Sequence, residues 1–147
     1  MDSSKVYLVQ TDTTVGFLSS NDKKLSTIKQ RDQNQKILQT VDSNKTLKQY
    51  TRVPKKFRKL VRRSKNTTFI YPNNLGLRVV DNLSYHHSFI SKFNCLYSTS
   101  ANKHKEDYDE EFAISNVDIV VYSKNSFNIS SESSIVKINK RMILKLR

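Results

Sequence analysis

The sequence predicts a single α/β domain, and three observations indicate that fold class. A chain of 147 residues has room for one modest hydrophobic core and not for two. Short runs rich in β-branched and aromatic residues recur along the chain, and they alternate with segments that space their apolar residues like a helix. With only two glycines and two prolines, the composition is that of a folded domain and not of a linker.

The N-terminal segment predicts two apolar runs separated by a polar break. Residues 5–10 read Lys-Val-Tyr-Leu-Val-Gln, a composition typical of a strand. Polar residues 11–14 interrupt this pattern, and residues 15–18 resume it. Gly16 is one of only two glycines, so we expect its backbone to occupy a position that other residues cannot.

A helix, a strand and a second helix are expected next. Asn21 can cap a short helix, on which Leu25 and Ile28 would share one face. Residues 36–41 then predict a strand, and residues 43–50 predict a helix.

A block of positive charge follows, and no acidic residue occurs between positions 42 and 81. Its cationic side chains are Arg52, Lys55, Lys56, Arg58, Lys59, Arg62, Arg63 and Lys65. Pro54 suits a first helical position, and Phe57, Leu60 and Val61 form an apolar stripe at helical spacing. We therefore expect an amphipathic helix that presents cations to solvent. These could serve solubility alone, or contact a phosphate backbone without reading bases, and the missing acids favour the second reading.

Two strands and a helix are expected in the middle of the chain. Residues 67–71 and 76–80 predict strands joined by a Pro-Asn-Asn turn, and residues 84–93 predict a helix. Its inward positions would be Tyr85, Phe89, Ile90 and Phe93. His86 and His87 would then lie on the polar side, and with no acid or cysteine beside them we predict no metal site.

The C-terminal third predicts five further elements. Residues 93–96 form an apolar lead-in to a strand, and the acidic residues 106–111 suit the first turn of a helix. Residues 117–122 and 133–138 predict strands, and residues 141–146 would form the closing strand.

The overall charge restricts the classes of partner. The chain has 26 Lys and Arg against 13 Asp and Glu, a formal net charge of +13, which favours nucleic acid, nucleotide phosphate or an anionic membrane surface. No apolar run approaches the ~20 residues of a membrane-spanning helix, and residues 1–5 do not resemble the start of a signal peptide. We therefore expect a cytoplasmic protein without a membrane segment. The single cysteine, Cys95, excludes an internal disulfide, and we expect it to be buried.

Two pairs of residues with equal spacing suggest a site. In an extended chain, residues two apart face the same way, so Lys29 and Arg31 could meet one ligand together, as could Ser100 and Asn102. Two cations opposite two neutral donors would suit a triphosphate. Each pair also has an ordinary interpretation, a solvated charge pair in the first case and a turn after a strand in the second.

These pairs resemble the motifs of a known family. Lys-x-Arg at residues 29–31, Ser-Ala-Asn at residues 100–102 and Thr-Asp-Thr at residues 11–13 are similar to motifs of the YrdC-like domain, in the same order. The resemblance covers residues 6–145, and it identifies residues 1–147 as a single YrdC-like domain. It implies a twisted mixed β-sheet flanked by helices, with a deep, positively charged concave site.

The resemblance also implies an activity, because characterised members of the family are threonylcarbamoyl-AMP synthases. In their reaction L-threonine and bicarbonate form a carbamate, which attacks the α-phosphate of ATP and releases pyrophosphate. The product serves the modification of tRNA to threonylcarbamoyladenosine. The implied partners are ATP with Mg²⁺ as a substrate complex, L-threonine, bicarbonate, tRNA and other proteins of that pathway, with no tightly bound cofactor.

The matching positions imply roles for individual residues. Lys29 and Arg31 would be the catalytic cations. The ATP-binding residues would be Lys29, Arg31, Thr68, Ser98, Ser100, Asn102 and Lys145. The threonine-binding residues would be Thr11, Thr13, Arg78 and Ser133.

The chain also departs from the family pattern. Val15 replaces a tyrosine, Thr40 stands where a histidine is common, and the family's Pro-Gly-Pro loop is absent before Thr68. His104 and Lys105 follow where the family has Ser-Gly, and Lys145 would take the place of the arginine in a terminal Leu-Arg.

A second function class therefore stays open. The chain could be a YrdC-like module that binds double-stranded RNA or tRNA without catalysis. Its contact surface would be Lys55, Lys56, Arg58, Lys59, Arg62 and Arg63. Binding to a membrane surface is a more distant alternative, because the apolar face of that helix is small for an interfacial helix.

Overall fold

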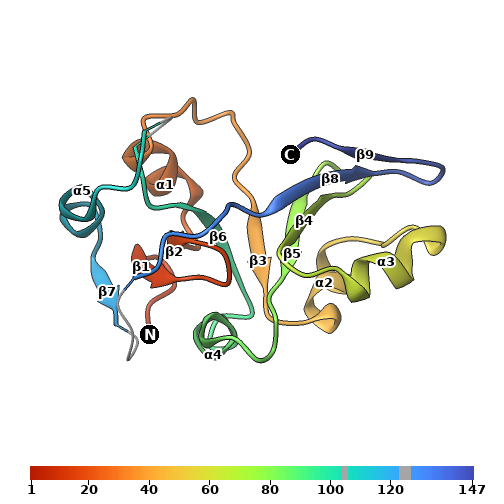
Figure 1. Ribbon diagram of the computed structural model, residues 1–147, viewed down its shortest axis with the longest axis horizontal. Coiled ribbons are helices and arrows are strands. Elements are labelled where there is room, and N and C mark those ends of the chain that lie inside the picture. Colours follow the sequence, from red (N-terminus) through yellow and green to blue (C-terminus); the bar gives the residue numbers. More distant parts are fainter. Residues whose placement is uncertain (104–105, 123–126) are drawn as a thin grey trace.

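The computed structural model describes residues 1–103, 106–122 and 127–147 and contains one twisted mixed sheet (Figure 1). The nine strands of these residues lie in the order β7-β1-β2-β6-β3-β5-β4-β8-β9. The β1–β7, β3–β5 and β4–β8 pairs are parallel and the other pairs are antiparallel. The strands are β1 (Tyr7–Gln10), β2 (Val15–Ser19), β3 (Gln39–Val41), β4 (Thr67–Ile70), β5 (Gly76–Val79), β6 (Cys95–Ser100), β7 (Ile119–Val121), β8 (Ser134–Ile138) and β9 (Ile143–Lys145). The predicted mixed sheet flanked by helices is confirmed.

Short helices connect the strands, and most begin at a side-chain cap. The helices are α1 (Asp22–Ile28), α2 (Asn44–Tyr50), the 3₁₀ turn η1 (Lys55–Phe57), α3 (Arg58–Arg63), α4 (Tyr85–Ile90) and α5 (Glu110–Ser115). The predicted cap is confirmed, since Asn21 accepts a hydrogen bond from the backbone N–H of Lys24 at 3.1 Å. Ser43, Ser84 and Asp109 cap α2, α4 and α5 in the same way. Among the described residues, no helix combines the length and apolar character needed to span a membrane.

One face of the sheet carries most of the hydrophobic core. Side chains of paired residues share a face, and Gln39 pairs with both Tyr97 and Leu77, so the face is continuous from β6 to β5. At the β1–β2 end of this face, Leu8 and Phe17 pack with residues of α1 and α5. At the other end, Leu77 packs with residues of α2 and α3. Figure 1 shows these two helix pairs at opposite ends of the sheet.

Of the described helices, only α4 covers the opposite face, and only at one end. Thr40 pairs with Leu96 on one side and Arg78 on the other, so these three side chains share this second face. Leu96 belongs to a core that α4 completes with Phe89 and Ile90. Thr40 and Arg78 instead line a cavity. The helix arrangement therefore leaves an opening over the middle of the sheet.

The predicted orientation of the fourth helix is wrong for two of its residues, Tyr85 and His86. Tyr85 is 69% exposed, whereas His86 is 1% exposed. Phe89 and Ile90 face inward as predicted. The hydrophobic pattern misplaced His86 because its burial depends on a polar partner, Asp12, that is distant in the sequence.

The predicted basic helix is broken into η1 and α3. Phe57 and Val61 are buried as expected, but Leu60 is 40% exposed, so the apolar stripe is narrower than predicted. Cys95 is a free thiol that is only partly buried, whereas a buried thiol was expected. His104 and Lys105 lie outside the described residues.

Candidate functional site

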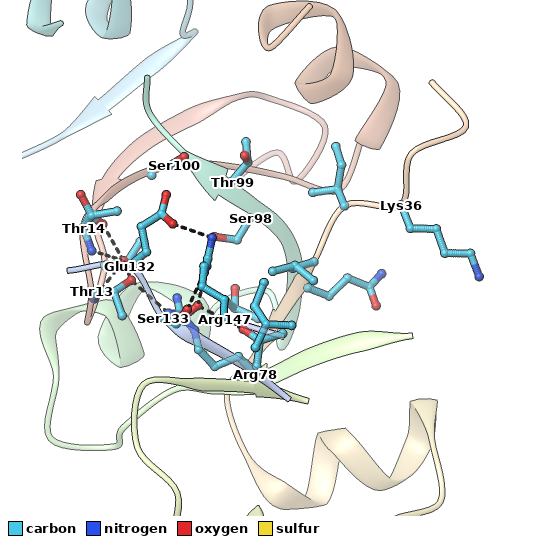
Figure 2. A pocket seen from close by; sticks show the side chains of 18 of the residues that line it. Thr13, Thr14, Lys36, Arg78, Ser98, Thr99, Ser100, Glu132, Ser133 and Arg147 are labelled. Atoms are coloured by element: carbon cyan, nitrogen blue, oxygen red, sulfur yellow. Dashed lines mark hydrogen bonds and ion pairs between the residues drawn. The ribbon is translucent and has the colours of Figure 1, made fainter. Parts of the chain in front are cut away.

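A cavity of about 310 Å³ lies on the open face of the sheet (Figure 2). Its wall is built from the loop after β1, the ends of β6, β5 and β4, the segment before β3 and the segment that enters β8. The structure brings together at this wall most of the predicted site residues, namely Thr11, Thr13, Arg31, Thr68, Arg78, Ser98, Ser100 and Ser133. Lys29, Asn102 and Lys145 do not line it.

Lys29 and Arg31 point in different directions because a turn separates them. Lys29 is the C-cap of α1, and Gln30 has a left-handed φ of 51°. The backbone N–H of Arg31 donates to Ser26 O and that of Gln30 donates to Thr27 O, both at 3.0 Å. This is the hydrogen-bond pattern of a Schellman motif, which ends a helix. The expectation of an extended Lys-x-Arg segment with both cations on one face is therefore wrong.

The Lys29 ammonium group is hydrogen-bonded to the end of β6. It donates to Ser100 O at 3.0 Å, to Asn102 Oδ1 at 2.8 Å and, at shorter range, to Asn102 O. Lys29 thus meets the predicted pair Ser100 and Asn102 directly, and it fastens α1 to β6. Burial, together with the charge of Arg31, lowers the pKa of Lys29 to about 8.

Arg31 reaches the cavity, where the cations outnumber the acids. Burial lowers the pKa of its guanidinium, while nearby Glu132 acts in the opposite direction. The Nε of Arg31 is buried and has no hydrogen-bond partner within the described ranges. Lys36, Arg78 and Arg147 also line the cavity, against the single carboxylate of Glu132 in the described lining. An anionic ligand is therefore favoured.

Arg147, and not Lys145, reaches the cavity from the C-terminal hairpin. Lys145 pairs with Val136, which lies on the helix-covered face, so the prediction that Lys145 contacts ATP does not fit the register. The N–H groups of Leu146 and Arg147 both donate to Ile135 O, at 2.8 and 3.2 Å. Two residues opposite one is a β-bulge, and the bulge turns Arg147 to the cavity face.

A polar network joins Arg147 to the strand ends beneath it. Arg147 forms an ion pair with Glu132 at 2.6 Å, and its Nε donates to Ser133 O at 2.9 Å. The hydroxyls of Ser133 and Thr68 are 3.3 Å apart. Figure 2 shows Arg147, Glu132 and Ser133 close together at one side of the cavity. These contacts orient a guanidinium and two hydroxyls toward the same ligand volume.

Arg78 lies at the base of the cavity in a buried ionic cluster. Its Nη2 is 3.1 Å from Asp12 Oδ1, and its Nη1 donates to Thr13 Oγ1 at 3.0 Å. The same Asp12 oxygen is 3.2 Å from His86 Nδ1. Burial opposes ionisation of Asp12, but the hydrogen bond from His86 and the charge of Arg78 outweigh it and hold the pKa of this carboxyl below its ordinary value.

The same cluster fixes the protonation of His86. Burial lowers the pKa of His86, although Asp12 acts in the opposite direction, so the imidazole is neutral at pH 7. Because a carboxylate can only accept, the neutral ring must carry its proton on Nδ1 and donate it to Asp12. Burial also lowers the pKa of Arg78, an effect that Asp12 opposes.

The loop after β1 is shaped by its own hydroxyls. Thr11 Oγ1 accepts from the N–H groups of Thr13 and Thr14 at 3.2 Å and donates to Thr14 O at 2.6 Å. Gly16 follows, and a Cβ there would lie 3.1 Å from both Thr11 Cγ2 and the backbone oxygen of Thr99. Other residues are thus disfavoured at Gly16, as expected, but the reason is close packing around the position of a Cβ and not an unusual backbone angle.

The chemistry available at this site is anion binding. In the described part of the chain, no three His, Cys, Asp or Glu side chains are grouped to hold a metal ion. One carboxylate in the described cavity wall is too little for a dedicated Mg²⁺ or Ca²⁺ site of the protein. Guanidinium groups and hydroxyls supply positioning and charge neutralisation instead.

The predicted basic surface is exposed and lies apart from the cavity. Its residues on η1 and α3, Lys55, Lys56, Arg58, Lys59, Arg62 and Arg63, are all exposed. None of them forms an ion pair with another described residue. None lines the cavity.

Comparison with known proteins identifies the family. The sequence model of the Sua5/YciO/YrdC domain, described as "Telomere recombination", matches residues 1–147. The chain belongs to the Sua5/YciO/YrdC family. The resemblance to the YrdC-like domain is thus confirmed, although no curated protein sequence gave a match.

Three solved structures show how far the fold of this family extends. Sua5 from P. abyssi, in a crystal structure with L-threonine, has a TM-score of 0.80 at 13% identity and matches 98% of this chain and 50% of its own. YciO from E. coli has a TM-score of 0.76 at 14% identity, over 98% and 82%. Full-length HypF, in a phosphate- and nucleotide-bound form, has a TM-score of 0.74 at 14% identity, over 98% and 27%. The chain therefore spans about half the length of Sua5, and at these identities the likeness is one of fold.

The residues that sequence reasoning missed are mainly Arg147 and Glu132. Leu146-Arg147 itself matches the terminal Leu-Arg of the family, and this signal could have identified Arg147. Glu132 belongs to none of the motifs of the sequence, although it lines the cavity and forms an ion pair with Arg147.

We expect the Lys29 amine to titrate near pH 8 in the folded protein. Since an unfolded lysine titrates near its ordinary value of 10.5, the unfolded chain binds more protons between pH 8 and 10.5. The free energy of unfolding that depends on Lys29 therefore rises with pH across that window. NMR of the ¹³Cε resonance of labelled lysine would give the midpoint, and Lys29→Met would assign the signal. A midpoint at or above pH 10 would contradict the described burial.

Proposed function

We propose that this chain is an L-threonylcarbamoyladenylate synthase-like enzyme, which forms threonylcarbamoyl-AMP and pyrophosphate from L-threonine, bicarbonate and ATP. One observation carries the proposal: three guanidinium groups line a single cavity. Those of Arg31 and Arg147 lie near its rim, and that of Arg78 is buried at its base. Family membership, and the crystal structure of Sua5 with L-threonine, support the amino-acid half of this proposal. The phosphate- and nucleotide-bound form of HypF supports the nucleotide half.

In the proposed nucleotide half, Arg31 and Arg147 receive the triphosphate of ATP. Arginine suits this role because its planar fork donates two N–H bonds to neighbouring phosphate oxygens. Ser98 and Ser100 on β6 add hydroxyl donors from the adjoining wall. Lys29 contributes indirectly, because it holds the end of α1 to Ser100 and so fixes the start of the segment that carries Arg31.

In the proposed amino-acid half, Arg78 receives the carboxylate of L-threonine. Its charge is already balanced by Asp12, and one N–H is held by Thr13, so the guanidinium is positioned before a ligand binds. Thr13, with the loop that Thr11 organises, forms the wall beside it. Ser133 lies nearer to Arg147 and Thr68 than to this loop, so in the proposed arrangement it serves the boundary between the two halves.

The proposed reaction needs positioning and charge neutralisation, and no covalent nucleophile of the protein. The amine of threonine joins bicarbonate with loss of water to give the carbamate. A carbamate oxygen then forms a bond to the α-phosphorus, and the bond from that phosphorus to the bridging oxygen of pyrophosphate breaks. The leaving group takes that electron pair, and Arg31 and Arg147 stabilise the charge it develops.

We expect pyrophosphate release to require ATP, Mg²⁺, L-threonine and bicarbonate together. Replacing Arg31 or Arg147 by methionine should reduce the rate about a hundredfold, because each change removes a charged donor aimed at the transferred group. Arg141→Met is the matched control, since Arg141 is exposed and lies outside the cavity. Release that does not depend on threonine, or full activity in both cavity variants, would contradict the proposal.

The second candidate function is binding of tRNA or double-stranded RNA by η1 and α3. The observation that favours it is the exposed basic surface, whose cations have no ion-pair partner among the described residues. Contacts of this kind release counterions and do not depend on sequence. The surface is compatible with the synthase proposal, because it does not overlap the cavity.

We expect RNA affinity to fall steeply with salt, and the triple replacement of Lys59, Arg62 and Arg63 by alanine to make that dependence shallower. The slope of log affinity against log salt should decrease in magnitude by about 2 to 3, because each lost phosphate contact contributes about 0.9, or about 0.7 for single strands. Fluorescence anisotropy with a tRNA and a double-stranded RNA, at several salt concentrations, measures both quantities.

The matched control removes the same charge elsewhere. Lys5, Lys23 and Lys92 are exposed and lie outside η1 and α3, so their replacement by alanine lowers the net charge by the same amount. If this control flattens the salt dependence as much as the α3 triple variant, the basic surface is not the RNA contact.

A further inference from the structure

The ionic cluster behind the cavity leaves two of its facing groups incompletely bonded. Within the described part of the chain, Arg78 Nε and Asp12 Oδ2 are both buried without a hydrogen-bond partner. Arginine and aspartate commonly pair through two parallel hydrogen bonds, which would use these atoms. Here a single oxygen of Asp12, Oδ1, accepts from both residues: it lies 3.1 Å from Nη2 of Arg78 and 3.2 Å from Nδ1 of His86.

We infer that His86 is a positioning residue, which acts through Asp12 to keep the terminal nitrogens of Arg78 directed at a carboxylate bound in the cavity. By donating to Oδ1, the imidazole fixes the rotation of the Asp12 carboxylate. Oδ2 then cannot swing to Nε of Arg78 without the loss of the bond from His86. The inference rests on the proposed function for the identity of the ligand.

The contacts of Arg78 show what this arrangement preserves. A guanidinium has five N–H bonds, of which one goes from Nη1 to Thr13 and one from Nη2 to Asp12. Since Nε is buried, the donors left for a ligand are the remaining N–H bonds of Nη1 and Nη2. Arg78 is buried yet lines the cavity, and Figure 2 shows it below Ser133 and Arg147 in that view. A carboxylate is the ligand class that matches two adjacent N–H donors.

Loss of His86 has a specific consequence in this geometry. Without the imidazole, Asp12 can turn so that Oδ2 accepts from Arg78 Nε, and two unpartnered buried atoms are satisfied at once. The two-bond pair reorients the guanidinium and weakens its bond to Thr13. Because Asp12 still balances the charge of Arg78, we expect the fold to persist. The terminal nitrogens of Arg78 would no longer be directed at a carboxylate in the cavity.

The test compares His86→Leu, which removes the donor, with His86→Asn, whose amide N–H can still reach Asp12. Calorimetry should show that His86→Leu raises the Kd of L-threonine at least tenfold and leaves the Kd of ATP within twofold. His86→Asn should keep both constants within threefold of wild type. A residue that only fills space would affect both ligands or neither, so equal effects on L-threonine and ATP, or an unchanged Kd of L-threonine in His86→Leu, would overturn the inference. His86→Met provides the same test should the leucine variant not fold.

A second readout separates this inference from the proposed function. The ¹Hε–¹⁵Nε NMR signal of Arg78, assigned by its loss in Arg78→Lys, should move downfield and exchange more slowly in His86→Leu, because Nε–H gains a carboxylate partner. It should stay in place in His86→Asn. An unchanged signal in His86→Leu would overturn the inference. If the wild-type protein binds no L-threonine, the amino-acid half of the proposed function fails, and the shift of this signal alone decides the role of His86.

Discussion

A charged arginine at the base of a cavity needs a counter-charge, and for Arg78 that charge is Asp12. Both side chains are only 6% exposed, so neither is stabilised by bulk water. Removing one partner of a buried pair typically costs about 3–5 kcal/mol, because the other is left uncompensated. The pair also ties the loop after β1 to β5, two segments that lie on opposite sides of β6 in the sheet. Much of the cavity's shape follows from this one contact.

The sheet and its helices supply the rest of the site. Four helices occupy one face and α4 covers only part of the other, so the strand ends of β6, β5 and β4 stay open to a ligand. Lys29 fastens α1 to the end of β6, and the bulge opposite Ile135 brings Arg147 across from the closing hairpin. Arg31, Arg78 and Arg147 are thus held by backbone geometry or by a polar partner, which limits the reorganisation that ligand binding would require.

The sequence predicted the features that depend on neighbouring residues. Strand and helix order follows from local hydrophobic patterns, and the Asn21 cap follows from residue type. Arg78, Thr13 and Ser100 were placed through family motifs, and all three line the cavity. The errors arise where a local irregularity of the backbone or a distant contact decides. The left-handed backbone of Gln30 points Lys29 and Arg31 in different directions, and the β-bulge places Arg147 instead of Lys145 at the cavity. Burial of His86 depends on Asp12, which lies 74 residues away in the sequence.

We propose that one cavity binds a nucleotide phosphate at its rim and an amino-acid carboxylate at its base. A crystal structure of the protein with L-threonine and a non-hydrolysable ATP analogue tests it most directly. We expect the threonine carboxylate within hydrogen-bond distance of the terminal nitrogens of Arg78, and the triphosphate between Arg31 and Arg147. Threonine bound away from Arg78, or a triphosphate outside the cavity, would contradict it.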